Sequence, residues 1–339
     1  MNTSNSKSPP PTAKLFFETI NAYQRTAAIK AAIELEIFTA IGKTDASAAE
    51  IAGRTKAAER GVRILCDFLT MLGFLNKEDD RYSLTPDSAA FLDRNSPTYA
   101  GGMLRFLLSS EIGGRFDELT DAVRNGGAMD KGTVAPEHPV WLEFARSMVG
   151  MVMPSAQALT EIISLDDSRD TKVLDVSASH GMWGISFAKK HPRAKIVALD
   201  WAPVLELTRE SAKRAGIENR FSTIAGSAFE VDFGSDYDLV LAPNFLHHFN
   251  IEDCVRFLKK AHGALGRGGR IAIIEFVPNE DRISPPESAG FSLIMLATTP
   301  EGDAYTLAEL EQMLSRAGFE SPEAHPLPPV STAIIARAG

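Results

Sequence analysis

Cysteine, long hydrophobic runs and excess positive charge are all scarce in this 339-residue chain. Its two cysteines, Cys66 and Cys254, are far apart and lie in apolar helical patterns, which argues against a disulfide framework and against a zinc site. No run of about 18 apolar residues occurs, so the sequence predicts no membrane-spanning helix. The formal net charge of −9 argues against nucleic acid and membranes as partners, because anionic partners require a basic face. Because no disulfide framework and no membrane-spanning helix are predicted, we expect a cytoplasmic protein.

Hydrophobic residues, by contrast, are abundant: they make up 44% of the chain, while charged residues make up 23%. This composition is typical of a globular protein with a large core, and the length predicts two domains. The first residues, 1–12, contain no apolar segment and are expected to form a disordered tail. We expect one domain at residues 13–100, a helical linker at 101–160 that contributes to a substrate pocket, and a second domain at 161–339.

The expected first domain begins with long helices. Between Lys14 and Ile41, apolar residues recur three and four positions apart, which predicts helices with one buried face. Ser47 and Glu50 have the spacing of a capping box that opens a short helix, and another helix is predicted over residues 57–72. Apolar segments on both sides of the charged turn KEDDR predict a hairpin. Helix, helix and hairpin in this order indicate a winged helix-turn-helix.

DNA binding is one function of such a fold. The second helix, AAERGVRILCDFLTMLG, offers few side chains that read bases, and the hairpin turn is acidic. A DNA reader would carry several Lys and Arg side chains there to contact phosphates. We therefore expect no nucleic-acid partner. We expect the excess apolar side chains of this domain to form the interface of a homodimer.

The segment at residues 101–160 is rich in aromatic and methionine side chains. Phe144 and Met148 are four residues apart and share a predicted helix face, with Trp141 and Met151 close by. Such residues form either an ordinary core or the wall of a pocket for an apolar substrate, because methionine adapts to varied ligand shapes. The sequence leaves both interpretations open.

Strands and helices alternate after Ser164, which predicts an α/β fold with a parallel sheet and right-handed crossovers. The predicted strands occupy residues 172–177, 195–200, 221–225, 237–242 and 270–277. A final helix over residues 306–317 and a last apolar segment, TAIIARA, predict an antiparallel hairpin that closes the sheet.

The turn after the first of these strands indicates the ligand. Its frame is Ser179-x-Gly181-x-x-Gly184, which is close to the G-x-G-x-x-G frame of dinucleotide sites. Asp175 stands just before the turn, where a carboxylate would repel a pyrophosphate but would suit a ligand with an ammonium and a sulfonium. These residues favour S-adenosylmethionine over NAD.

The next two strand ends complete a predicted nucleoside pocket. Asp200 ends its strand at the place where a carboxylate accepts hydrogen bonds from both ribose hydroxyls. Trp201 beside it and Phe229 after the third strand are placed to stack on adenine. Each residue alone has a structural explanation, as a helix cap or a core side chain. Three of them in register with strand ends favour the pocket.

Together these features resemble the winged-helix-containing S-adenosylmethionine-dependent O-methyltransferases, the family of plant caffeate and acetylserotonin O-methyltransferases and bacterial natural-product relatives. The similarity runs from Lys14 to the end of the chain, through the segments LDVSASHG, ALDWAPVLE, GSAFE and LHHFNIEDCVRFLKKAHGALGRGGRIAIIE. It implies a Rossmann-like class I methyltransferase domain with a mostly parallel seven-stranded sheet. It also implies S-adenosylmethionine as cofactor, S-adenosylhomocysteine as product, no metal, and a homodimer formed through the first domain.

The resemblance assigns the catalytic residues. In this family the general base is the His seven residues before a helical Cys, a position that His247 holds before Cys254. Glu275, at the end of the fifth strand, corresponds to the acid that orients the base. An imidazole suits the removal of one proton from a phenol or alcohol at neutral pH. Ala304, beside Asp303, replaces the family's second acid, which leaves C- or S-methylation, or a reaction that retains the cofactor's methyl group, as alternatives.

The expected cofactor-binding residues lie at the strand ends and in the turns after them: Asp175, Ser177, Ser179, Gly181, Asp200, Trp201, Gly226, Ser227, Ala228, Phe229 and Asn244. Ser177 and Ser179 replace the usual turn glycines, so we expect negative φ angles at both. Ser227 replaces the family's usual acid near the adenine amine.

The expected acceptor-binding residues are Phe144, Met148, Asn244, His248, Phe291 and Met295. Phe291 and Met295 share a helix face in the segment after the fifth strand, and His248 is expected to point away from the base. The sequence thus predicts O-methylation of a small apolar or aromatic hydroxylated metabolite. A winged-helix regulator that senses a ligand is the remote alternative.

Overall fold

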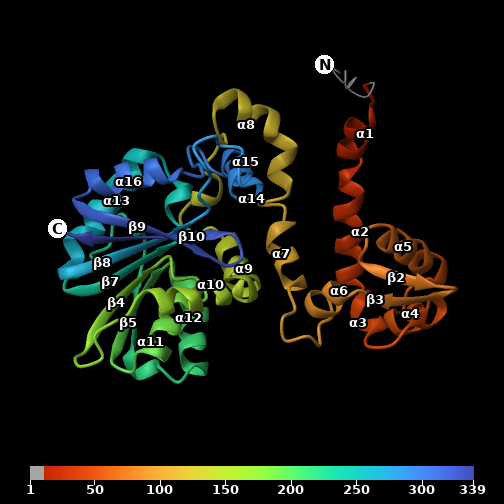
Figure 1. The fold of residues 1–339 in the computed structure, drawn as a ribbon, viewed down its shortest axis with the longest axis horizontal. Coiled ribbons are helices and arrows are strands. Elements are labelled where there is room, and N and C mark those ends of the chain that lie inside the picture. The colour runs from red at the N-terminus through yellow and green to blue at the C-terminus, as the bar shows by residue number, and fades with distance from the viewer. Residues whose placement is uncertain (1–10) are drawn as a thin grey trace, which may run out of the picture. The chain divides into compact units, whose positions relative to one another are not determined.

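The computed structural model describes residues 11–339, which form two compact units that separate after Gly101 (Figure 1). Apart from its last two residues, the expected tail at residues 1–12 lies outside the described part of the chain. The domain boundaries expected from the sequence stay predictions. The elements of the first unit are α1 (Lys14–Ile20), α2 (Ala22–Glu34), α3 (Ile37–Ile41), β1 (Ala46–Ser47), α4 (Ala48–Thr55), α5 (Glu59–Met71), β2 (Leu75–Glu78), β3 (Arg81–Leu84) and α6 (Pro86–Phe91).

The first unit has the predicted capping box and hairpin. The Ser47 hydroxyl accepts from the Glu50 N–H at 3.3 Å, and the Glu50 carboxylate accepts from the Ser47 N–H at 2.7 Å, at the start of α4. Strand β3 pairs antiparallel with both β1 and β2. The buried Tyr82 of β3 donates its hydroxyl to Asp67 of α5 at 2.7 Å, which fastens the hairpin to the second helix.

Helix α1 differs from its expected form. Within the described residues it buries none of its side chains, so the prediction of one buried face is wrong for this helix. Leu15 is 76% exposed and Phe16 is 62% exposed. Burying a large apolar side chain is worth roughly 1.5–3 kcal/mol, so this face loses that stabilisation in a single chain.

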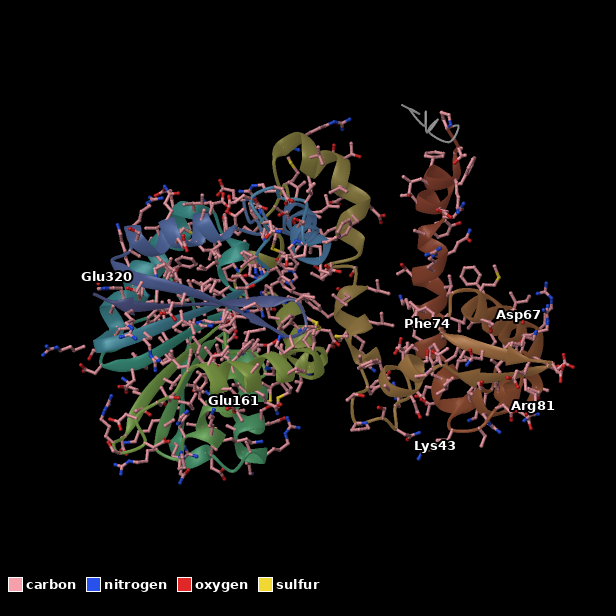
Figure 2. The ribbon with its side chains drawn as sticks, viewed as in Figure 1. Lys43, Asp67, Phe74, Arg81, Glu161 and Glu320 are labelled. Atoms are coloured by element: carbon pink, nitrogen blue, oxygen red, sulfur yellow. The ribbon has the colours of Figure 1, made fainter. Side chains whose placement is uncertain are left out.

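The cations of the hairpin are paired with neighbouring carboxylates. The Nζ atom of Lys77 lies 2.7 Å from the Asp67 carboxylate. The Arg81 guanidinium lies 3.1 Å from both Asp45 and Glu50; Asp67 and Arg81 are labelled in Figure 2. The charge that a DNA phosphate would need is therefore already engaged within the unit.

The second unit is an α/β structure. Its first half contains α7 (Leu104–Leu107), η2 (Gly114–Glu118), α8 (Leu119–Asn125), η3 (Gly132–Val134), α9 (Val140–Ser147), α10 (Val149–Ile162), β4 (Thr171–Val176), α11 (Met182–Lys190), β5 (Ala194–Asp200), α12 (Ala202–Arg214), η4 (Glu218–Arg220) and β6 (Phe221–Ala225). Its second half contains β7 (Tyr237–Pro243), η5 (Leu246–His248), α13 (Ile251–Ala264), β8 (Leu265–Glu275), α14 (Pro286–Ala289), α15 (Phe291–Thr298), α16 (Leu307–Arg316), β9 (Phe319–Leu327) and β10 (Ser331–Ala338).

The seven strands of this unit form one sheet in the order β6-β5-β4-β7-β8-β10-β9. The first five strands run parallel, and β10 runs antiparallel to both β8 and β9. The predicted fold class and closing hairpin are confirmed. Strand β8 begins at Leu265, earlier than predicted, and ends at Glu275, where its pairing with Thr332 of β10 also ends.

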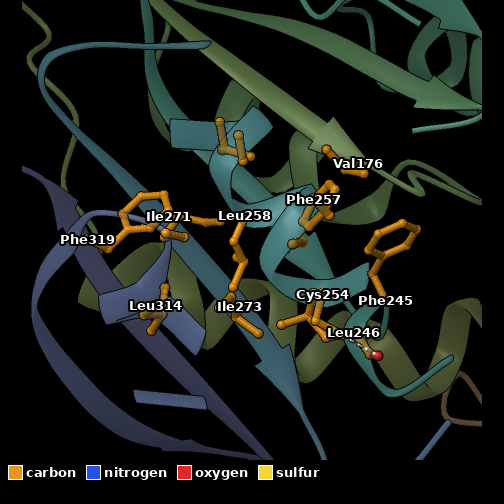
Figure 3. Close-up of a cluster of buried hydrophobic side chains, with 14 of the residues drawn as sticks. Val176, Phe245, Leu246, Cys254, Phe257, Leu258, Ile271, Ile273, Leu314 and Phe319 are labelled. Carbon is orange, nitrogen blue, oxygen red and sulfur yellow. Dashed lines mark hydrogen bonds between the residues drawn. The ribbon is translucent and has the colours of Figure 1, made fainter. Parts of the chain in front are cut away.

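Helices cover both faces of the sheet, so its central strands are apolar on both sides. Leu174 and Val176 of β4 belong to the same apolar cluster as Phe257 of α13 and Leu314 of α16. Figure 3 shows Val176 beside Phe257. Val173 points to the other face, where it packs with residues of α10 and α11. This alternation holds β4 firmly and thereby positions the turn that follows it.

The helices of the chain are short. No helix among residues 11–339 is long and apolar enough to cross a membrane.

Candidate functional site

A cavity of about 460 Å³ lies at the carboxyl ends of the parallel strands. Ser177 follows β4, Asp200 ends β5, Ser227 follows β6 and Pro243 ends β7, and all four line the cavity. Open α/β sheets bind ligands at this edge, because strand ends and helix N-termini converge there.

The turn after β4 has an unexpected backbone. Ser177 and Ser179 adopt φ angles of 54° and 52°, so the expectation of negative φ is wrong at both positions. A non-glycine residue in this left-handed region costs roughly 1–2 kcal/mol. The turn therefore keeps the shape of a glycine turn while it carries two hydroxyl groups, and both serines line the cavity.

Asp175 lies behind the turn and does not line the cavity, which differs from its expected position against the ligand. One carboxylate oxygen accepts the Gly184 N–H at 2.9 Å, and the other has no partner within residues 11–339. A Cβ atom on Gly184 would lie 2.6 Å from Ile196, so helix α11 approaches the sheet closely only because this residue is glycine. Burial raises the pKa of Asp175 to about 7, and the nearby Asp200 adds to that effect.

The Asp200 carboxylate links the turn after β4 to the end of β5. Its carboxylate accepts the Ser179 N–H at 2.8 Å and the Trp201 N–H at 2.7 Å. Burial raises the pKa of Asp200 to about 6, although these two N–H donors oppose the rise. Two backbone hydrogen bonds leave lone pairs on the carboxylate, and Asp200 lines the cavity, so it can accept further donors from a ligand.

Of the other predicted cofactor residues, most lie on the cavity and two do not. Trp201, Ser227, Ala228, Phe229 and Asn244 line it. Gly181 and Gly226 lie outside its lining. Gly181 has a φ angle of 79°, and a Cβ atom there would lie 2.8 Å from Thr208, so this residue lets the backbone turn into α11.

His247 and Glu275 form a buried pair at the cavity. Nδ1 of His247 is hydrogen bonded to one oxygen of the Glu275 carboxylate. The other oxygen accepts the N–H groups of Phe245 at 3.1 Å and Leu246 at 2.8 Å. His247 lines the cavity, whereas Glu275 stands behind it. With Nδ1–H directed to a carboxylate, Nε2 carries the lone pair of the neutral ring, which is the arrangement of a general base.

The position of the family's second acid is a buried alanine, Ala304. The neighbouring Asp303 accepts the Ala304 N–H at 2.8 Å and pairs with Arg282 at 3.3 Å. Its carboxylate is therefore engaged with Arg282 and does not replace the missing acid. Glu275 is the only carboxylate paired with His247 in the part of the chain that the structure describes.

The predicted acceptor residues all line the same cavity: Phe144, Met148, Asn244, His248, Phe291 and Met295. Phe291 and Met295 lie on α15, as predicted, and the Phe291 ring meets the His247 ring edge-on, with centroids 4.8 Å apart. Met148, however, lies between α9 and α10, because α9 ends at Ser147. Its N–H still donates to the Phe144 carbonyl at 2.9 Å, and both side chains belong to one apolar cluster, as their predicted shared face implies.

His248 was expected to point away from the base, but its ring centroid lies only 4.3 Å from that of His247, so this expectation is wrong. Its ring also meets the Trp141 ring edge-on, with centroids 5.0 Å apart. Burial lowers the pKa of His248 well below its ordinary value, and the neighbouring His247 adds to this effect. The ring is thus neutral and lines the cavity beside the base.

Several residues that sequence reasoning missed also line the cavity. His180 and Trp183 follow the β4 turn, and residues 133–136 and 329–331 reach the cavity from distant loops. A polar residue inside the turn was the available signal for His180. The loops carry no comparable signal, because their approach depends on the tertiary structure.

The cavity lining has acidic side chains. Asp200 and Glu230 line the cavity, but within the described chain no Lys or Arg does. Among residues 11–339 no three His, Cys, Asp or Glu side chains gather as a metal site requires.

Comparison with known proteins identifies two matching family models. An O-methyltransferase domain matches residues 138–320, and an O-methyltransferase dimerisation domain matches residues 17–94. A 3-hydroxy-5-methyl-1-naphthoate 3-O-methyltransferase of Streptomyces sahachiroi is 29% identical over 87% of this chain and 86% of its own length. An L-tyrosine C(3)-methyltransferase of Streptomyces lavendulae is 27% identical over 86% of this chain and 82% of its own length.

Solved structures show the same similarity. A candidate O-methyltransferase of Nostoc punctiforme is 50% identical, with a TM-score of 0.94 over 97% of this chain and all of that chain. Human N-acetylserotonin methyltransferase, solved in complex with S-adenosylmethionine, is 22% identical, with a TM-score of 0.83 over the whole of both chains. The second likeness concerns the fold alone.

Proposed function

Because this chain belongs to the S-adenosylmethionine-dependent O-methyltransferases that carry a dimerisation domain, we propose that it methylates a hydroxyl of a small apolar aromatic molecule. In this proposal His247 is the general base and Glu275 orients it. The observation that carries the proposal is the buried His247–Glu275 pair, which opens onto a cavity with an apolar wall.

The cofactor half of the cavity fits S-adenosylmethionine. In this proposal Asp200 accepts hydrogen bonds from the ribose hydroxyls, and Trp201 and Phe229, which line the cavity, stack on the adenine ring. The cofactor supplies a methyl group that its sulfonium already activates for displacement. The remaining work of the protein is to align the acceptor with that carbon and to remove one proton.

His247 performs the proton step in this proposal. Its Nε2 lone pair would accept the proton of the acceptor hydroxyl, which would leave that oxygen as the nucleophile toward the cofactor's methyl group. The Glu275 carboxylate then stabilises the protonated ring through the Nδ1–H bond. Phe291, edge-on to His247, holds an aromatic acceptor near the base and excludes water.

Acceptor identity is tested with labelled S-adenosylmethionine and a set of phenols, indoles, thiols and hydroxy acids. We expect label transfer to a phenolic hydroxyl. Calorimetric titration with S-adenosylhomocysteine provides a separate test of the cofactor site. A purified protein that binds neither cofactor nor product would contradict the proposal.

A second candidate is C- or S-methylation, or a reaction that retains S-adenosylmethionine without transferring its methyl group. Ala304 favours it, because the second acid is absent and Asp303 is paired with Arg282. The similarity to an L-tyrosine C(3)-methyltransferase also supports it. Label found on carbon or sulfur, or conversion of the acceptor while S-adenosylmethionine keeps its label, would favour this candidate over O-methylation.

Homodimer formation through the first unit is part of the proposal. The matching dimerisation domain supports it, as does the exposed apolar face of α1. A ligand-sensing regulator that binds DNA is the remote alternative, against which the paired hairpin cations argue. Light scattering at a dimer mass, and no salt-sensitive retention on duplex DNA, are the expected results.

A further inference from the structure

His180, inside the turn between β4 and α11, presents a buried ring nitrogen that is without a partner. The residue is 2% exposed and lines the cavity. Its Nδ1 accepts the Met182 N–H at 3.1 Å, while its Nε2 has no hydrogen-bond partner among the described residues. Buried polar atoms of this kind are rare unless a ligand or water completes them.

The hydrogen bond to Met182 decides which ring nitrogen carries the proton. Since Nδ1 accepts an N–H, it must hold the lone pair, and the proton of the neutral ring is on Nε2. Burial lowers the pKa of His180 to about 4, so the ring is neutral at neutral pH. His180 therefore offers an N–H donor in a fixed tautomer, and the matching ligand atom is a hydrogen-bond acceptor.

The position of the ring indicates which ligand it meets. The His180 ring lies nearly parallel to the Phe144 ring, with an interplanar angle of 18° and centroids 6.4 Å apart. Phe144 belongs to the apolar cluster that walls the acceptor half of the cavity, together with Met148 and Trp141. A flat acceptor against Phe144 would thus extend toward His180.

The charge of the cavity restricts the ligand atom further. Within residues 11–339 no Lys or Arg lines the cavity, so a carboxylate or phosphate on the acceptor would be buried without a cation. A carbonyl oxygen is a strong neutral acceptor and brings no such charge. We propose that His180 Nε2–H binds a carbonyl oxygen of the acceptor. This inference rests on the proposed O-methylation. The preferred substrate is then an aromatic ring that carries a hydroxyl and a neutral carbonyl group.

Two substitutions separate this role from a structural one. The Oδ1 atom of Asn occupies the place of Nδ1, so His180→Asn keeps the acceptor for the Met182 N–H and removes the donor at Nε2. His180→Gln does the reverse, because its terminal amide reaches the place of Nε2. The two variants are compared with the wild type on pairs of hydroxyaryl compounds that differ only by a ketone carbonyl or a methylene at one position.

We expect the wild type to prefer the ketone by about tenfold or more in kcat/KM. His180→Asn should reduce this preference to below about twofold, through KM rather than kcat, and His180→Gln should retain most of it. S-adenosylhomocysteine affinity, measured by calorimetry, should stay within about twofold in both variants, and thermal unfolding checks that both are folded.

Three outcomes would overturn the inference. In the first, His180→Asn keeps the ketone preference while His180→Gln is impaired, which would make His180 a structural cap of α11. In the second, His180→Asn loses tenfold or more in S-adenosylhomocysteine affinity, which would assign the donor to the cofactor. In the third, the wild type shows no ketone preference. A wild type that methylates no hydroxyl in either series would contradict the proposed function itself, and this result is distinct from the other three.

Discussion

The two halves of the cavity are built in different ways. The cofactor half consists of turns at the ends of β4, β5 and β6, and Asp200 ties two of these segments together through backbone N–H groups. The acceptor half consists of apolar side chains from α9, α10, α15 and several loops. Hydrogen bonds to a buried carboxylate set one geometry, whereas apolar contacts tolerate exchange of side chains of similar volume.

The proposed cofactor half is therefore the more tightly constrained of the two. Even the two serines in its first turn adopt the left-handed backbone of glycine. The acceptor wall carries no such constraint, apart from His247 and its carboxylate. His247 and His180 are polar residues that line the cavity beside this apolar wall.

Removal of the proposed base, His247, should have the largest effect on activity. For His247→Ala we expect kcat for a phenol to fall by roughly 10²–10⁴, because a positioned general base contributes about that factor. S-adenosylhomocysteine affinity should be unchanged. His325→Ala, on β9 and away from the cavity, is the control and should keep wild-type kcat. A loss of less than fivefold would favour an intrinsically nucleophilic acceptor atom, and hence the second candidate.

The pH dependence of stability tests the burial of Asp175, which lies behind the β4 turn. Burial raises the pKa of Asp175 from 3.8 to about 7, so the folded chain keeps a proton over that range that the unfolded chain loses. Its contribution to stability is therefore fully present below about pH 4 and is lost as the pH rises through 7. A shift of this size corresponds to an upper limit on the order of 4 kcal/mol, since each pKa unit is about 1.4 kcal/mol.

Asp175→Asn should remove this dependence. Its free energy of unfolding, from urea titrations between pH 4 and 8, should decline less with pH than that of the wild type. The exposed Asp79→Asn is the matched control and should follow the wild-type curve. Parallel curves for wild type and Asp175→Asn would contradict the assignment.

A pair of substitutions tests whether the two halves act separately. Asp200→Asn places an amide N–H2 against a backbone N–H, so S-adenosylhomocysteine affinity should fall by roughly 10- to 30-fold, consistent with about 1.5–2 kcal/mol for a bond to a charged group. Phe144→Ala should leave that affinity within about twofold and raise the KM of the acceptor about tenfold. Calorimetry and steady-state kinetics measure the two effects. Equal losses of cofactor affinity would mean that the halves are coupled.

The smallest expected effect concerns the serines of the β4 turn. Ser177→Gly combined with Ser179→Gly should raise the free energy of unfolding by about 1 kcal/mol, because relief of left-handed strain exceeds the extra flexibility of the unfolded chain. Ser315→Gly, at an exposed helical position, makes the same chemical change and should destabilise the chain instead. Denaturant unfolding distinguishes the signs. Destabilisation by the double variant would show that the hydroxyls hold the turn.

The sequence by itself determined the order of strands and helices, the closing hairpin and the cofactor edge, because strand ends are readable from apolar periodicity and from the residues that interrupt it. Asp200 and Phe229 were found in this way, whereas His247 was assigned by the resemblance to the family; all three line the cavity. Whether Asp175 faces the ligand was decided by the tertiary structure, since the side on which a strand-end carboxylate emerges depends on how closely α11 packs against the sheet.

The backbone of Ser177 and Ser179 was likewise decided only in three dimensions, as was the unpartnered nitrogen of His180. Local sequence favours negative φ at serine, but distant residues hold the Ser179 backbone: Asp200 accepts its N–H and Thr208 donates to its carbonyl. The acceptor half of the cavity depends most on the tertiary structure. It joins loops far apart in the chain, so no local pattern records which of their side chains meet.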